Sequence, residues 1–224
     1  QLSPTPMVDF IENKMVSATE PNSAGEPVFS YIADFASPRP IKIAIDISKR
    51  YIDAPIFKFD ILSTNEDLKK FVAANPNVKY LDLNGCYYID DFSPIANLKY
   101  LEELDLTDCR ELNNIDFLAN LVNLRVLNLG ITRVNSIEAL KNLVKLEILD
   151  LRFTRIKEIS AIRHLINLHD LILWGTNYLY SLDGLQYCQE LRSLDLTNCG
   201  MLVSIEEIRN LRKLQTLLMN YSNV

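Results

Sequence analysis

The sequence predicts an elongated α/β solenoid in which short parallel strands stack along one axis. Three observations support this fold class: an apolar unit recurs every 22 or 23 residues, each unit holds an alternating Leu-x-Leu core, and a second apolar series follows at intervals of three. Periods of roughly 20 to 50 residues are typical of chains built from stacked units, in which each unit contacts only its neighbours.

The strand of each unit follows from the pattern Leu-x-x-Leu-x-Leu, whose first apolar residue is taken as position one. Alternation at positions four and six, as at Leu149 and Leu151, is typical of a strand with one buried face. The side chains at positions three, five and seven then point outward. Position one falls at Val78, Leu101, Leu124, Leu146, Leu168, Leu191 and Leu214.

Each unit continues with a small residue at position nine and then a return limb. The return limb has an apolar residue at every third position, as at Ile159, Ile162 and Leu165, and this spacing suits a 3₁₀ or irregular helical turn. The 23-residue units carry one extra residue before this run. Position nine is occupied by Cys86, Cys109, Thr132, Thr154, Thr176, Cys199 and Ser222.

These units resemble the leucine-rich repeat family over about residues 56–224. The 22-residue units look most like the internalin and phosphatase-regulator type, and the Cys units are similar to the cysteine-containing type found with F-box proteins. The resemblance implies a curved superhelix with its strands on the concave face and 3₁₀ or irregular segments on the convex side. It implies little about activity, because one fold supports many functions.

The ends of the solenoid need separate predictions. Residues 1–55 are expected to form an N-terminal α+β cap, because the first layer would otherwise expose its apolar residues. The alternation over residues 41–47 predicts a strand there. Residues 56–77 look like a degenerate first unit whose return limb is a helix capped by Thr64 or Asn65.

The chain stops halfway through the unit that begins at Leu214. We interpret this as a fragment or a naturally short end, and the protein is expected to be a monomer. The alternative is an end-to-end dimer through the uncapped last layer.

Composition narrows the partner class. A net charge of −6 argues against nucleic acid, because phosphates require a basic excess. Apolar runs stay far short of the roughly 18 residues of a membrane-spanning helix, so membrane insertion is not expected. His164 and His169 are too few and too isolated for a zinc site, and no metal or cofactor is expected.

The four cysteines are interpreted as small buried hydrophobes rather than as a metal or redox site. Unbridged cysteines suit a reducing compartment, which favours a cytoplasmic location. The alternatives are a secreted effector or a surface protein.

No catalytic motif is recognisable in the sequence: there is no P-loop, nucleophile elbow, zinc-protease helix motif or Cys-x-x-Cys pair. An outward column of carboxylates runs along position five, and paired carboxylates can perform acid–base chemistry. We interpret this column as a solvated ladder and expect no enzymatic activity. Its members are Asp82, Asp105, Asp150 and Asp195.

The outward face predicts a binding surface that is acidic in its N-terminal half and apolar in its middle. Trp174, the single tryptophan, points outward by register, and exposed tryptophans are typical interface anchors. The alternative is that its ring lies flat over neighbouring residues. Position ten carries Arg110, Arg133 and Arg155, a basic edge that suits a carboxylate- or phosphate-bearing partner. The alternative is ordinary charge pairing with Asp108 or Glu158.

The sequence therefore predicts a non-enzymatic protein–protein interaction module whose protein partner docks on the concave face. The alternatives are a substrate-recognition or targeting arm of a larger enzyme, ligase or bacterial effector, and a phosphatase-regulator-like subunit. An internalin-type adhesin is a weaker alternative. The expected partner-binding residues are Ile148, Arg152, Ile172, Trp174, Arg133, Arg155, Tyr80 and Asp105.

Overall fold

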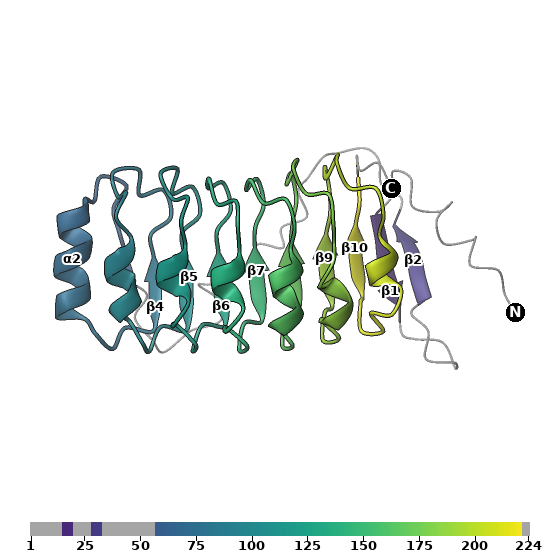
Figure 1. The fold of residues 1–224 in the computed structure, drawn as a ribbon, viewed down its shortest axis with the longest axis horizontal. Coiled ribbons are helices and arrows are strands. Elements are labelled where there is room, and N and C mark those ends of the chain that lie inside the picture. Colours follow the sequence, from purple (N-terminus) through teal and green to yellow (C-terminus); the bar gives the residue numbers. More distant parts are fainter. Residues whose placement is uncertain (1–14, 20–27, 33–56, 221–224) are drawn as a thin grey trace, which may run out of the picture.

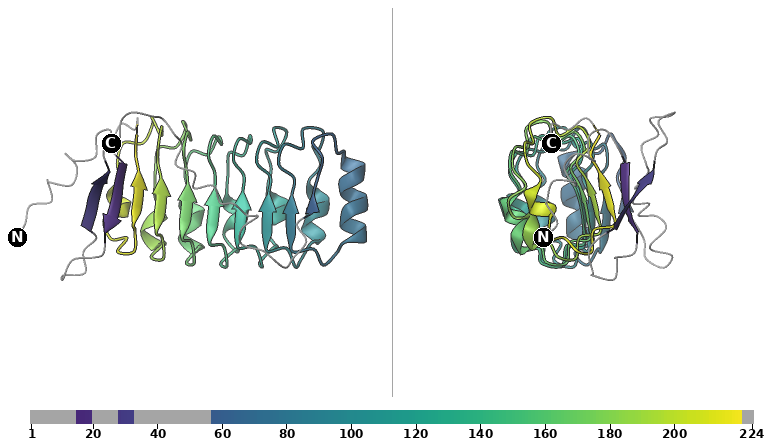
Figure 2. Two further views of the ribbon diagram at one scale, coloured as in Figure 1. Left: turned by 180° about the vertical axis from the view of Figure 1, so that it is seen from behind. Right: turned by 90° about the vertical axis from the view of Figure 1, so that its right-hand side faces the viewer.

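A computed structural model describes residues 15–19, 28–32 and 57–220 of the chain. In this part, one short strand and one helical segment alternate along a single long axis (Figure 1). Seen from the end, the strands form one face and the helical segments form the opposite face (Figure 2). The predicted solenoid and its return limbs are confirmed.

The strand face is a parallel sheet in which each unit contributes one strand. Neighbouring strands are in register, so that Leu127 lies beside Leu149 and Leu149 beside Leu171. The described parallel strands are β3 (Phe57–Lys58), β4 (Tyr80–Asp82), β5 (Glu103–Asp105), β6 (Val126–Asn128), β7 (Ile148–Asp150), β8 (Asp170–Ile172), β9 (Ser193–Asp195) and β10 (Thr216–Leu218).

The helical face begins with α2 (Asn65–Ala74), which closes the first layer. Thr64 is its N-cap: the Thr64 hydroxyl accepts a hydrogen bond from the Asp67 amide, and the Asp67 carboxylate accepts one from the Thr64 amide at 2.9 Å. The following units use 3₁₀ turns instead: η1 (Ser93–Asn97), η2 (Asp116–Leu118), η3 (Glu138–Leu140), η4 (Ser160–His164), η5 (Leu185–Tyr187) and η6 (Glu206–Ile208).

The core consists of apolar columns between the two faces. Leu104, Leu127 and Leu149 are completely buried, as are their equivalents along the stack. Complete burial of one such side chain contributes roughly 1.5–3 kcal/mol. Because each unit repeats the column, the stack is stabilised layer by layer rather than around one centre.

The two described strands of the N-terminal region lie at the far end of the stack. Strands β1 (Met15–Thr19) and β2 (Val28–Ile32) pair antiparallel with each other, and β1 also pairs antiparallel with β10. The sequence placed the cap of residues 1–55 beside the first unit, whereas these strands lie beside the last. The outer edge of β10 offers backbone donors and acceptors that another strand can satisfy. The strand expected at residues 41–47 and the half unit at 221–224 lie outside the described residues.

Candidate partner-binding surface

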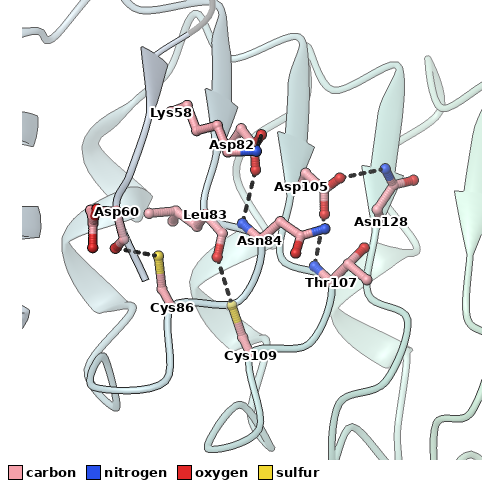
Figure 3. Close-up of polar contacts among 10 residues, drawn as sticks. All are labelled: Lys58, Asp60, Asp82, Leu83, Asn84, Cys86, Asp105, Thr107, Cys109 and Asn128. Atoms are coloured by element: carbon pink, nitrogen blue, oxygen red, sulfur yellow. Dashed lines mark hydrogen bonds and ion pairs between the residues drawn. The ribbon is translucent and has the colours of Figure 1, made fainter. Parts of the chain in front are cut away.

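The side chains at position nine make two kinds of hydrogen bond. In Figure 3, the Cys109 thiol donates a hydrogen bond to the Leu83 carbonyl of the preceding unit at 3.2 Å. The Thr154 hydroxyl instead donates to the Leu151 carbonyl of its own unit at 2.6 Å, and Thr132 does the same with Leu129 at 2.7 Å. Cysteine at this position therefore links layers, whereas Thr132 and Thr154 close the turn within one layer.

The four cysteines are buried and free, as the sequence predicted. Burial raises the pKa of the Cys86 and Cys199 thiols to about 11 and that of Cys188 to about 12. Burial also raises the pKa of the Cys109 thiol. These thiols are protonated near neutral pH, so they pack as small side chains and are poor nucleophiles.

The position-five aspartates end the strands. Each carboxylate accepts a hydrogen bond from the backbone amide two residues later, at 2.8 to 2.9 Å. Figure 3 shows this contact for Asp82 and Asp105, and shows the Asn128 amide donating to Asp105 at 3.1 Å. The column therefore has a structural role along the sheet.

Asp150 departs from the predicted solvated ladder, because it is only 3% exposed. Burial raises the pKa of this carboxyl to about 6, Asp105 and Asp195 add to the increase, and Arg152 opposes it. The Arg152 guanidinium lies 3.2 Å from the Asp150 carboxylate. The interpretation as a fully solvated column is therefore wrong at this position.

The structure divides the predicted partner-binding residues into three groups. Tyr80, Ile148 and Ile172 are buried, Asp105, Arg152 and Trp174 are half-buried, and Arg133 and Arg155 are exposed. The apolar middle of the strand face therefore offers a partner little surface at Ile148 and Ile172. The accessible part of the predicted set lies along the loops that follow the strands, here called the ascending edge.

Two of the three position-ten arginines on the ascending edge have acidic neighbours. Arg110 forms an ion pair with Asp108 at 2.8 Å, as the alternative interpretation expected. Arg133 contacts Glu111 at 3.1 Å, with both side chains about half exposed. The Arg155 guanidinium has no ion pair within the described part of the chain. A bound acidic group would find this cation available.

Two glycines provide the space in which larger side chains rest. The Phe153 ring lies against Gly175, where a Cβ would approach its Cε1 atom to 2.4 Å. The same ring is 4.8 Å from that of Trp174, at an interplanar angle of 57°. Gly130 similarly leaves room for the stem of Arg152, whose Cγ would lie 2.9 Å from an added Cβ. Trp174 is therefore held beside a neighbouring aromatic ring.

Position eight, at the turn after each strand, is left-handed in the six units that begin at Val78, Leu101, Leu124, Leu146, Leu168 and Leu191. Glycine, asparagine and aspartate adopt this conformation at low cost, whereas other residues lose roughly 1–2 kcal/mol there. Ile131 and Phe153 adopt it nevertheless, with φ of 59° and 54°, and they are 41% and 40% exposed. The column consists of Gly85, Asp108, Ile131, Phe153, Gly175 and Asn198.

Sequence reasoning did not single out Ile131 and Phe153 as binding residues. The available signal was their departure from the small or turn-forming residues at position eight of the other units. That signal depends on knowing that this position has a positive φ.

Comparison with known families agrees with the geometry. A family model described as a leucine-rich repeat region matches residues 82–224. The chain belongs to the leucine-rich repeat family. A search of curated proteins finds no match to this leucine-rich repeat chain.

Several solved structures of internalins share the fold. An internalin (inlF) from Listeria monocytogenes strain 4b F2365 is 24% identical with a TM-score of 0.63, over 71% of this chain and 45% of that one. Internalin C2 (inlC2) of the same strain is 22% identical with a TM-score of 0.56, over 63% and 61%. The functional domain of InlJ from Listeria monocytogenes, which includes a cysteine ladder, is 20% identical with a TM-score of 0.52, over 67% and 36%. The present chain therefore spans between about a third and three fifths of these proteins.

The same comparisons bear on the general function. Leucine-rich repeat proteins of this architecture commonly bind other proteins. Within residues 15–19, 28–32 and 57–220, no helix is both long enough and apolar enough to cross a membrane.

Proposed function

We propose that this leucine-rich repeat chain is a non-enzymatic module that binds a protein partner along the concave face and its ascending edge. The observation that carries the proposal is an exposed Arg155 without an ion pair among the described residues, close in the stack to a half-buried Trp174 and to Arg152. Arginine forms paired hydrogen bonds with carboxylates, and tryptophan supplies a large apolar contact. Arg133 extends the basic row by one unit.

A capture experiment tests this proposal. The chain is immobilised and exposed to a cell lysate beside a Trp174→Ala/Arg152→Ala variant. We expect a partner that the unaltered chain retains and the variant loses. A Tyr187→Ala/Arg209→Ala variant is the matched control, because it removes one aromatic and one arginine from the convex side. A partner retained equally by all three proteins would contradict the proposed placement.

A second candidate is a targeting arm of a larger protein, either an enzyme, a ligase or an effector. The limited share of the internalin structures that this chain covers favours it. Capture that succeeds only with a longer reading frame would support this candidate. A phosphatase-regulator-like role rests on resemblance of the Thr units alone.

We also propose that the chain works in a reducing compartment such as the cytoplasm, because its four cysteines are free and buried. Thiol titration without reductant tests this. We expect no rapid reaction in the folded protein. Protein isolated under conditions that prevent thiol oxidation should show four reactive thiols after unfolding. Fewer thiols after unfolding would indicate disulfides and favour a secreted or surface location.

A further inference from the structure

The middle of the ascending edge differs from its two flanks. The 22-residue units that begin at Leu124 and Leu146 place Val134 and Ile156 two residues after position nine, whereas the 23-residue units place the equivalent apolar residue three residues after it. In Figure 1, the loops that follow β6 and β7 accordingly reach less far than those on either side. These two shorter loops are the ones that carry Ile131 and Phe153 at position eight.

The backbone conformation makes these two residues unusual. Core packing does not require an apolar side chain at position eight, because four other units have glycine, asparagine or aspartate there. Ile131 and Phe153 nevertheless adopt a left-handed backbone, and about two fifths of the surface of each is exposed. Strain of this kind is typically kept where a side chain serves function rather than stability.

The surroundings define the chemistry of a partner. Arg133 and Arg155 follow Ile131 and Phe153 two residues later, and Lys157 is exposed beyond them. Glu111, which contacts Arg133, and the exposed Glu158 after Lys157 supply compensating charges at two sides, so the three cations outnumber the carboxylates beside them. This cationic stretch belongs to a chain whose net charge is −6, so it is a local exception. Charge complementarity therefore favours an acidic ligand with an apolar anchor.

We propose that Ile131 and Phe153 are the anchor contacts for an acidic segment of a protein partner, one in which aspartates or glutamates flank an aromatic or branched aliphatic residue. The apolar residue of this segment packs between Ile131 and the Phe153–Trp174 ring pair. Its carboxylates bind Arg155 and Arg133. This inference rests on the proposed function and specifies its partner class.

A displayed library of random 12-residue peptides provides the probe. The library is selected in parallel against the unaltered chain and against an Ile131→Asn/Phe153→Asn variant. We expect the unaltered chain to enrich acidic peptides with one central apolar residue, and the variant not to enrich them. Enrichment of basic peptides, enrichment that is the same for both proteins, or no enrichment at all would overturn the inference.

The best enriched peptide is then made with a fluorescent label for binding measurements. Ile131→Asn is expected to weaken its binding at least tenfold, and Trp174 emission should change on binding to the unaltered chain, because Trp174 is the single tryptophan. Asn198→Gly, which changes the same position in another unit, is the matched control and should bind normally. Unchanged affinity of Ile131→Asn would overturn the inference.

Folding stability separates a binding role from a structural one. Asparagine suits a left-handed backbone better than isoleucine does, so Ile131→Asn should unfold at an equal or higher urea concentration. A variant that unfolds at a clearly lower concentration would show that Ile131 serves stability, which contradicts the proposal. A dimer of the unaltered chain that Ile131→Asn dissociates would also overturn it, because the occupant would then be a second copy.

The capture experiment distinguishes the proposed function from the proposed anchor residues. If Trp174→Ala/Arg152→Ala loses the lysate partner while Ile131→Asn/Phe153→Asn retains it, the proposed function stands and this inference fails. If the lysate partner is retained by every variant, the placement of the binding surface fails as a whole.

Discussion

The Cys units near the start of the stack and the Thr units in its middle have the same core and differ at their ascending edge. Cys86 and Cys109 donate to carbonyls of the preceding unit, at 3.6 and 3.2 Å, through loops that are one residue longer. Thr132 and Thr154 bond within their own unit, through shorter loops. The shorter loops carry the left-handed Ile131 and Phe153, and Arg155, which has no ion pair within the described part of the chain. The difference indicates that the Cys units add contacts between layers, whereas the two shorter Thr units bond internally and place Ile131 and Phe153 on their left-handed turns.

Substitution of the left-handed glycines is expected to give the largest difference in stability loss between the two regions. Gly175→Ala places a Cβ 2.4 Å from the Phe153 ring on a backbone with φ of 71°, and we expect a loss of about 2–4 kcal/mol. Gly85→Ala has a similar φ of 72°, but its nearest contact is 3.5 Å away, so we expect about 1–2 kcal/mol. Urea unfolding measures both. Equal losses of stability in the two variants would show that the Phe153 ring moves aside at little energetic cost.

The position-nine bonds should differ in strength as well. Thr154→Val keeps the volume but removes the 2.6 Å hydroxyl donor to the Leu151 carbonyl, which keeps only the Thr154 amide at 3.2 Å, and we expect a loss of about 1.5 kcal/mol. Cys109→Ala removes a weak thiol donor and a small volume, for which about 1 kcal/mol is expected. A larger loss for Cys109→Ala would contradict the distinction between the two kinds of unit.

Asp150 gives the middle units a pH dependence. Its folded pKa of about 6 exceeds the ordinary value of 3.8, so the folded state keeps a proton that the unfolded state releases between these values. The contribution of Asp150 to stability therefore falls as pH rises through this window, by about 1–3 kcal/mol in total. Asp150→Asn keeps an acceptor for the Arg152 amide and should remove this dependence. The urea midpoint of the Asp150→Asn variant, measured at several pH values, should decrease less between pH of about 4 and 7 than the midpoint of the unaltered chain. Parallel pH profiles for the two proteins would contradict this assignment.

The smallest expected effect is a gain in folding stability on substitution of Ile131. Ile131→Asn should raise the free energy of unfolding by about 1 kcal/mol, because it relieves a left-handed isoleucine that is substantially exposed. Asn198→Asp, at the same position in a flanking unit, should change it by less. A loss of stability for Ile131→Asn would remove the contrast between the middle and the flanks.

Local pattern accounts for what the sequence could predict. Alternation at Leu149 and Leu151, the three-residue spacing from Ile159, and the capping box at Thr64 each depend on neighbours within one unit. The repetition of these signals fixes the register of the whole stack. The fold was therefore predictable in the strands and 3₁₀ turns of its repeats and in helix α2.

Features that depend on contacts between distant segments, or on the backbone conformation, could not be predicted from local sequence patterns. Pairing of β1 with β10 joins the two ends of the chain, and no local pattern specifies it. The burial of Ile148 and Ile172 could not be deduced from an outward register, because register gives direction and not accessibility. The exposure of Ile131 became informative only once its positive φ was known.

The most direct test of the account follows Trp174 emission while the captured partner, or the best enriched peptide, is added to the unaltered chain. Trp174 is the single tryptophan and lies 4.8 Å from Phe153 at the centre of the proposed surface. We expect a saturable change in Trp174 emission with the same midpoint as binding measured independently. Tight binding without any change in Trp174 emission would contradict the claim that the middle units form the binding surface.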